Sequence, residues 1–132
     1  MQNVYTASQM PADYPKQPLE CWQIYNYIFA MKLRFAWDET KNRSNQRKHG
    51  GIAFEMAAQV FRDPFRLTRH DRIEDGEERW QTLGVVQGVT VLLVAHTITE
   101  DDEEGEPVEV IRIISARRAM PRERKRYEQE NR

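Results

Sequence analysis

The pattern of apolar and polar residues first predicts a strand over residues 32–37. Large apolar side chains alternate there with basic or small ones in the run KLRFAW, and a period of two is typical of a strand with one buried face. The next segment, from Asp38 to His49, has no apolar stripe, but Asp38 suits a helix N-cap and Gly50-Gly51 a helix stop. We therefore predict a strand followed by a helix that is polar all round.

Apolar residues return at helical spacing over residues 54–61. Phe54, Ala57, Ala58 and Phe61 repeat at intervals of three and four, and Asp63-Pro64 ends the pattern. This spacing is typical of a helix that packs on a core. We therefore interpret its aromatic residues as core positions and not as a cofactor site.

Three strands are predicted in the second half of the chain. Residues 79–86 and 89–97 are separated only by Gln87-Gly88, a two-residue turn that favours a hairpin. Residues 107–115 are rich in Val and Ile and supply the third strand. The acidic tract over residues 100–106 is predicted to be a long solvated hairpin loop.

Two further features complete the predicted order. Residues 66–73 are a poorly patterned candidate for an edge strand, and Pro121 suits the first turn of a final helix. The order is then β-α-α-β-β-β-α. Short hairpin links favour an α+β fold in which an antiparallel sheet of about four strands is packed with helices.

Residues 1–30 are predicted to be an N-terminal extension, irregular or not native, before a domain over residues 31–132. The aromatic run near Trp22 is too short and polar to cross a membrane, which takes about 20 apolar residues, and no signal-peptide pattern is present. Cys21 is the single cysteine and cannot form an internal disulfide, which favours a reducing compartment. We expect a cytoplasmic protein without membrane association.

The net charge of −1 conceals a strong segregation of charge along the chain. Residues 31–73 hold ten basic and five acidic residues, residues 74–110 one basic and eleven acidic, and residues 111–132 eight basic and three acidic. Segregated charge can create a basic surface in a protein of neutral average. We predict that the polar helix ending at His49 and the region 117–126 converge on one basic face, with the acidic loop elsewhere.

Several chemistries are excluded by missing motifs. The chain has no Walker phosphate loop, no dinucleotide-binding glycine fingerprint and no zinc-protease histidine pair. His49, His70 and His96 lie far apart and match no metal spacing. No helix-turn-helix or basic-region signature indicates direct DNA readout. We therefore predict no metal and no cofactor.

The remaining candidates are one histidine and a set of cations. An unperturbed imidazole titrates near pH 6.5, so His49 can transfer a proton at neutral pH. Arginine suits phosphate because its planar fork matches the phosphate oxygens. RNA can be cut without a metal when a base activates the 2′-hydroxyl and cations stabilise the charged phosphorane. Basic clusters are common, however, and on chemistry alone these residue types favour RNA or protein binding over cleavage.

A series of motif positions runs in order along residues 32–127. The opening group is Phe35, Trp37, Asp38, Lys41, Asn45, Lys48, His49 and Gly50, and it continues through Phe54, Ala57 or Ala58, Phe61, Asp63 and Pro64. The later positions are Glu78, Arg79 and Gly84, the run 111–119 (IRIISARRA), Glu123 and Tyr127. This series resembles the BrnT family, the ribonuclease partners of BrnA antitoxins. Gly50-Gly51 is one residue longer than the commoner turn, the acidic loop is also longer, and residues 1–30 lie outside the resemblance.

The resemblance implies a RelE-like ribonuclease fold and an endoribonuclease toxin of a type II toxin-antitoxin system. Such a toxin cleaves RNA, which inhibits translation and arrests growth. Its implied partner is a BrnA-like ribbon-helix-helix antitoxin whose dimer binds operator DNA, so the toxin reaches DNA only indirectly.

Roles for individual residues are hypotheses. We assign proton transfer to His49 and assistance in phosphate binding to Lys48. Three arginines would position or stabilise the phosphate: Arg79, Arg117 and Arg118. Four further residues would bind RNA: Lys41, Asn45, Arg122 and Arg126.

Each role has a structural alternative. His49 can simply cap the polar helix, and Arg79 can pair with Glu77 or Glu78. Arg117 can hold the final helix through Glu123. At the level of the whole chain, the alternative is a non-catalytic module of the same fold that binds RNA or an antitoxin.

Overall fold

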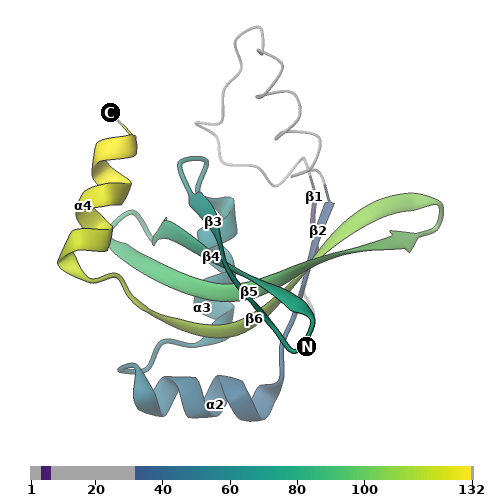
Figure 1. Ribbon diagram of the computed structural model, residues 1–132, viewed down its shortest axis with the longest axis horizontal. Helices are drawn as coiled ribbons and strands as arrows, with labels where there is room; N and C mark the ends of the chain where they lie inside the picture. Colours follow the sequence, from purple (N-terminus) through teal and green to yellow (C-terminus); the bar gives the residue numbers. More distant parts are fainter. Residues whose placement is uncertain (1–3, 7–31, 132) are drawn as a thin grey trace, which may run out of the picture.

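A computed structural model describes residues 4–6 and 32–131 of the chain, and within them six strands form one sheet (Figure 1). The strands follow the order β1-β2-β6-β5-β4-β3 across the sheet. Their bounds are β1 Val4–Thr6, β2 Lys32–Ala36, β3 Leu67–Glu74, β4 Glu77–Val86, β5 Thr90–Glu103 and β6 Glu106–Arg118. Apart from β1, which pairs antiparallel with β2, the predicted extension 1–30 lies outside the described residues.

The helices begin and end close to the predicted signals. They are α2 Glu39–Lys48, α3 Phe54–Ala58, the 3₁₀ turn η2 Gln59–Arg62 and α4 Pro121–Glu130. Asp38 caps α2, because its carboxylate accepts the backbone N–H of Thr40 at 2.8 Å and that of Lys41 at 3.2 Å. The chain then leaves the helix through Gly50, whose φ of +62° favours glycine.

The main core lies between one face of the sheet and the helical segment of α3 and η2. Phe35, Phe54 and Ile111 are fully or almost fully buried there, together with most of the apolar residues of the helical segment 54–61. Gly84 on β4 lets Val60 of η2 pack directly against the sheet. A Cβ at this position would lie 2.6 Å from Val60 Cγ1, which leaves no room for a larger residue.

A smaller apolar cluster holds α4 to the sheet. Tyr127 packs with Leu83, Val91 and Leu93, and its hydroxyl donates a hydrogen bond to the Asp63 carboxylate. Burial and this contact together raise the Tyr127 pKa above its usual value. The final helix is therefore fixed through both an apolar contact and a polar one.

Two parts of the predicted topology are wrong. The sheet is mixed and not purely antiparallel, because β2 runs parallel to β6 with Phe35 opposite Ile111. It also has more than about four strands, because residues 67–74, predicted only as a possible edge strand, form β3 against β4 and β1 adds a short strand. The α+β class itself is confirmed.

The acidic tract is a pair of strands and not a loop. β5 and β6 stay paired from Asp101, opposite Val108, to Glu103, opposite Glu106. Cations of β2 stabilise this ribbon: Arg34 pairs with Asp101 at 2.7 Å and also with Glu103, and Lys32 lies 3.4 Å from Glu106. The cations of β2 thus neutralise carboxylates on both strands of the ribbon, on the neighbouring β6 and on β5 beyond it, which lets a highly acidic segment remain extended.

We predict that acidification destabilises the fold through His96. This side chain is fully buried, with its Nε2 2.7 Å from Thr82 Oγ1 and its ring edge-on to Phe61. Burial lowers the His96 pKa from 6.5 to about 4. The unfolded chain therefore takes up the proton first, so stability is full above pH 6.5 and about 3 kcal/mol is lost as the pH falls to 4.

Urea unfolding between pH 7.5 and pH 4.5 measures this loss. His96→Gln removes the imidazole and is expected to flatten the pH dependence, whereas His70→Gln, at an exposed position on β3, is expected to keep it. An equal slope in the wild type and His96→Gln would contradict the assignment.

Candidate functional site

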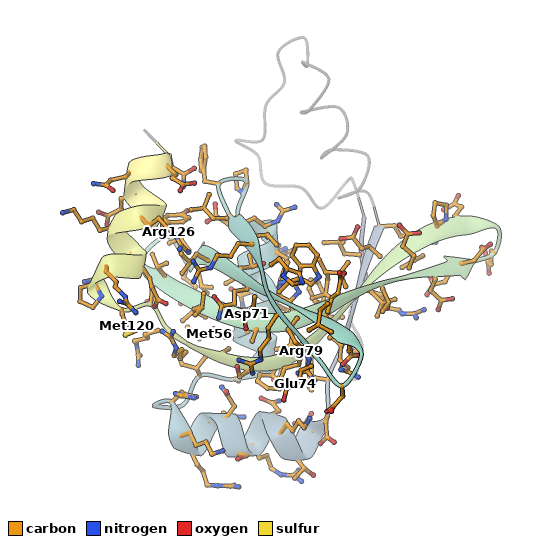
Figure 2. The ribbon with its side chains drawn as sticks, viewed as in Figure 1. Met56, Asp71, Glu74, Arg79, Met120 and Arg126 are labelled. Carbon is orange, nitrogen blue, oxygen red and sulfur yellow. The ribbon has the colours of Figure 1, made fainter. Side chains whose placement is uncertain are left out.

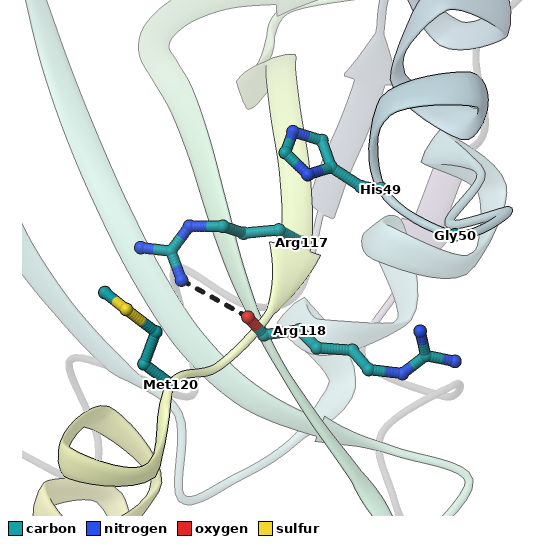
Figure 3. Close-up of a pocket in the computed structure, with 5 residues that line it drawn as sticks. All are labelled: His49, Gly50, Arg117, Arg118 and Met120. Carbon is teal, nitrogen blue, oxygen red and sulfur yellow. Dashed lines mark hydrogen bonds between the residues drawn. The ribbon is translucent and has the colours of Figure 1, made fainter.

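One pocket joins the C-terminal end of α2 to the end of β6 and the start of α4 (Figure 3). It has a volume of about 350 Å³ and is lined by His49, Gly50, Arg117, Arg118 and Met120. The pocket therefore brings the end of the polar helix together with the start of the 117–126 region, as predicted, and a single basic face over the whole of both segments stays a prediction. Met120 also lines the pocket, although no sequence motif indicates it. It reaches the pocket because it lies in the turn between β6 and α4.

Asn45 explains why the end of α2 lies beside β6. Its Nδ2 donates to the carbonyls of Ile52 and Ala116, each at 2.8 Å, and its Oδ1 accepts the Ala116 N–H at 3.0 Å. His49 follows one turn later as the C-cap of α2, with its backbone N–H donated to the Asn45 carbonyl at 2.9 Å. The expectation that Asn45 lies on an exposed RNA-binding face is wrong, because the side chain is buried and its amide bonds the backbone.

The two adjacent arginines of the pocket have different surroundings. Arg117 forms a two-pronged ion pair with Glu123, with nitrogen–oxygen distances of 2.8 and 3.0 Å. This contact raises the pKa of Arg117 and lowers that of Glu123. Arg118 is exposed, forms no ion pair with any described residue, and would lie 3.2 Å from a Cβ placed on Gly50. Arg118 is thus the arginine whose charge is available to a ligand.

Arg79 does not line the pocket, although the sequence predicts that it positions the phosphate together with Arg117 and Arg118. Its side chain pairs with Glu77 at 3.5 Å, and the same carboxylate accepts a hydrogen bond from Arg112 at 2.5 Å. The strand register explains the separation: Leu83 lies opposite Leu93, and Leu93 lies opposite Arg117. Arg79 comes four residues before Leu83 on β4, roughly 13 Å along the strand. Figure 2 places Arg79 on the sheet and Arg126 on α4.

The other cations divide into two groups. Most cations on the strands are ion-paired, each within 4.0 Å of a carboxylate: Lys32, Arg34, Arg72, Arg79 and Arg112. Arg69 on β3 instead donates hydrogen bonds to the Gln81 side chain. On the helices beside the pocket, by contrast, the cations make no ion pair with any described residue. They are Lys41, Arg43, Arg47 and Lys48 on α2, and Arg122, Arg124, Lys125 and Arg126 on α4.

The acidic ribbon lies away from these unpaired cations. Figure 1 shows its tip projecting from the side of the sheet opposite α4. Lys41 and Lys48 stand one turn before and one turn after Asn45, the residue that ties α2 to β6. Among the described residues, the cations that form no ion pair are therefore concentrated on α2, at the pocket and on α4.

Metal chemistry has no evident set of ligands in the described part of the chain. No group of three or more His, Cys, Asp or Glu side chains within residues 4–6 and 32–131 could hold a metal ion. Of the three histidines, His96 is buried in the core and His70 lies on β3. Cys21 lies outside the described residues. Among the helices that the structure describes, none is long and apolar enough to cross a membrane.

Comparison with known proteins places this α+β domain in a defined class. A family model described as "Ribonuclease toxin, BrnT, of type II toxin-antitoxin system" matches residues 37–123. The matched range includes the whole of α2, the pocket arginines and Glu123. The chain belongs to the BrnT family of ribonuclease toxins.

One solved structure similar to this chain is the ribonuclease toxin BrnT of Brucella abortus. It shares 21% sequence identity with a TM-score of 0.38, and the match covers 65% of this chain and 95% of the Brucella chain. No match was found among the curated proteins.

Proposed function

We propose that this chain is a toxin that cleaves RNA without a metal ion, with the pocket between α2 and α4 as its active site. The observation that carries the proposal is the pairing in one pocket of His49, which can transfer a proton, with Arg118, which has no acidic partner among the described residues. Membership of a ribonuclease toxin family supports the same reaction class.

The chemistry follows from the two side chains. The His49 imidazole accepts the proton of a 2′-hydroxyl, and the 2′-oxygen attacks the adjacent phosphorus. The 5′-oxygen leaves and takes a proton from water, so the products carry a 2′,3′-cyclic phosphate and a 5′-hydroxyl. Arg118 stabilises the charge that develops on the phosphate oxygens, and Lys48 assists in binding the phosphate.

The RNA would follow the unpaired cations on either side of the pocket. Lys41 and Lys48 on α2 and Arg122 and Arg126 on α4 provide phosphate contacts, and such contacts make binding weaken steeply with salt. We leave Arg79 and Asn45 out of this surface because one is paired with Glu77 and the other is buried.

The biological setting is proposed from the family. The toxin domain, residues 31–132, would act in the cytoplasm with a fold related to RelE ribonucleases, inhibit translation and arrest growth. A BrnA-like ribbon-helix-helix antitoxin would neutralise it and would connect it to operator DNA.

Incubation of the purified full chain with RNA in excess EDTA tests the proposal. We expect cleavage to fragments ending in 2′,3′-cyclic phosphate, and no cleavage of the same sequence with 2′-O-methyl groups, which lack the attacking hydroxyl. RNA that is bound in a salt-dependent manner but stays intact would instead support the non-catalytic module. Cleavage that requires a divalent metal would contradict the metal-free mechanism.

A further inference from the structure

We propose that Glu123 is a positioning residue of the pocket, which acts on the reaction through Arg117; this inference rests on the proposed RNA-cleaving function. Glu123 does not line the pocket, yet its carboxylate contacts two residues that do. Its Oε1 accepts Arg117 Nη1 and the Met120 N–H, both at 2.8 Å, and its Oε2 accepts Arg117 Nη2 at 3.0 Å.

The contacts extend to a third residue of the pocket wall. Arg117 Nη1 also donates to the Arg118 carbonyl at 3.2 Å (Figure 3). One carboxylate therefore fixes the guanidinium of Arg117, the backbone where α4 begins and, through Arg117, the backbone of Arg118. Only 8% of Glu123 is exposed, so water competes little for these contacts.

Helix capping alone does not account for this arrangement. The Met120 N–H needs one acceptor oxygen, whereas Glu123 uses both of its oxygens on Arg117. A bidentate pair holds an arginine in one orientation, which a single hydrogen bond does not. Arg117 would otherwise lose its defined place in the pocket wall, because its long side chain has many rotamers.

The ion pair with Glu123 also gives the two arginines of the pocket different roles. Arg117 has its charge compensated and forms a rigid wall, while Arg118 keeps a free charge for the phosphate. Two explanations of Glu123 then differ in their consequences. If Glu123 only added negative charge near RNA, its neutralisation would tighten binding and leave the chemical step unchanged. If it positions Arg117, neutralisation slows the chemical step.

The test is a kinetic comparison of full-length Glu123→Gln with Glu128→Gln. Glu128 is exposed on the same helix, so each variant removes one negative charge from α4. We expect Glu123→Gln to lower kcat for RNA cleavage in EDTA about tenfold or more without raising KM, because a displaced Arg117 no longer fixes the backbone of Arg118. Glu128→Gln is expected to keep the wild-type kcat. An equal kcat for both variants would overturn the proposal.

Arg117→Lys provides a second, independent variant. It leaves Glu123 free to cap Met120 and keeps the positive charge, but lysine cannot form the two-pronged contact. We expect a loss of kcat similar to that of Glu123→Gln. A kcat close to wild type in folded Arg117→Lys would show that Glu123 serves the helix alone. If the wild-type chain itself leaves RNA intact, both the proposed function and the role of Glu123 are overturned. If only the variants behave like wild type, the role of Glu123 alone is overturned.

Discussion

Arg118→Ala is expected to lower the rate of RNA cleavage about 100-fold or more, with little effect on stability. Loss of one donor that stabilises transition-state charge typically costs about 2.7–4 kcal/mol, which corresponds to that range of rates. The side chain is exposed and makes no ion pair with any described residue, so the free energy of unfolding should change by no more than about 0.5 kcal/mol. Single-turnover cleavage in EDTA and urea unfolding measure the two effects.

Arg79→Ala is the matched control for this prediction. Both substitutions remove one arginine, but Arg79 lies along the sheet outside the pocket and is paired with Glu77. We expect its cleavage rate to remain within a few-fold of wild type. A large loss in Arg79→Ala together with an active Arg118→Ala would move the site from the α2–α4 pocket to the sheet.

The second large effect is expected at Asn45, and it concerns stability. Asn45→Ala removes three hydrogen bonds and leaves the N–H and carbonyl of Ala116 without their partner in the interior. Each buried polar group left unsatisfied costs about 1–3 kcal/mol. We therefore expect a loss of about 3–5 kcal/mol in the free energy of unfolding, a large fraction of the stability of a small domain. Urea unfolding measures it directly.

Lys41→Ala, one turn earlier on the same helix, separates the structural role from RNA binding. Lys41 is exposed, so its removal should leave stability nearly unchanged while weakening RNA affinity and reducing the salt dependence of binding by about one phosphate contact. Wild-type stability in Asn45→Ala would contradict the buried tie between α2 and β6.

Local signals of the sequence were sufficient for most elements. The alternation at residues 32–37 predicted β2, and Asp38 marked the start of α2, where its carboxylate caps the helix. The turn at Gln87-Gly88 correctly joined β4 to β5, and Pro121 opens α4. These features depend on neighbours in the chain, so local propensity and capping determine them.

Features that depend on distant partners were not predictable in the same way. The partner of Asn45 on β6 is 71 residues away in sequence, so the polar helix looked exposed along its whole circumference. The parallel pairing of β2 with β6 likewise joins strands from the two ends of the domain. The acidic tract looked like a solvated loop because its stabilising cations, Lys32 and Arg34, are supplied by β2.

The candidate site likewise has a part that the sequence predicted and a part that depends on distant residues. Residue chemistry selected His49 and Arg118, and the fold brings both to one pocket. Which arginines keep a free charge could not be read from composition, because it depends on whether a carboxylate lies within reach, as Glu123 does for Arg117 and Glu77 for Arg79.

The most direct test of the central claim is the single-turnover rate of RNA cleavage in EDTA by wild type and by His49→Ala, with the ends of the fragments identified. If the pocket is a metal-independent active site, His49→Ala will remain folded, bind RNA with similar affinity and cleave it about 10²–10⁴ times more slowly, as expected on loss of a general base. The residual product will still carry a 2′,3′-cyclic phosphate. Undiminished cleavage by folded His49→Ala would contradict the account.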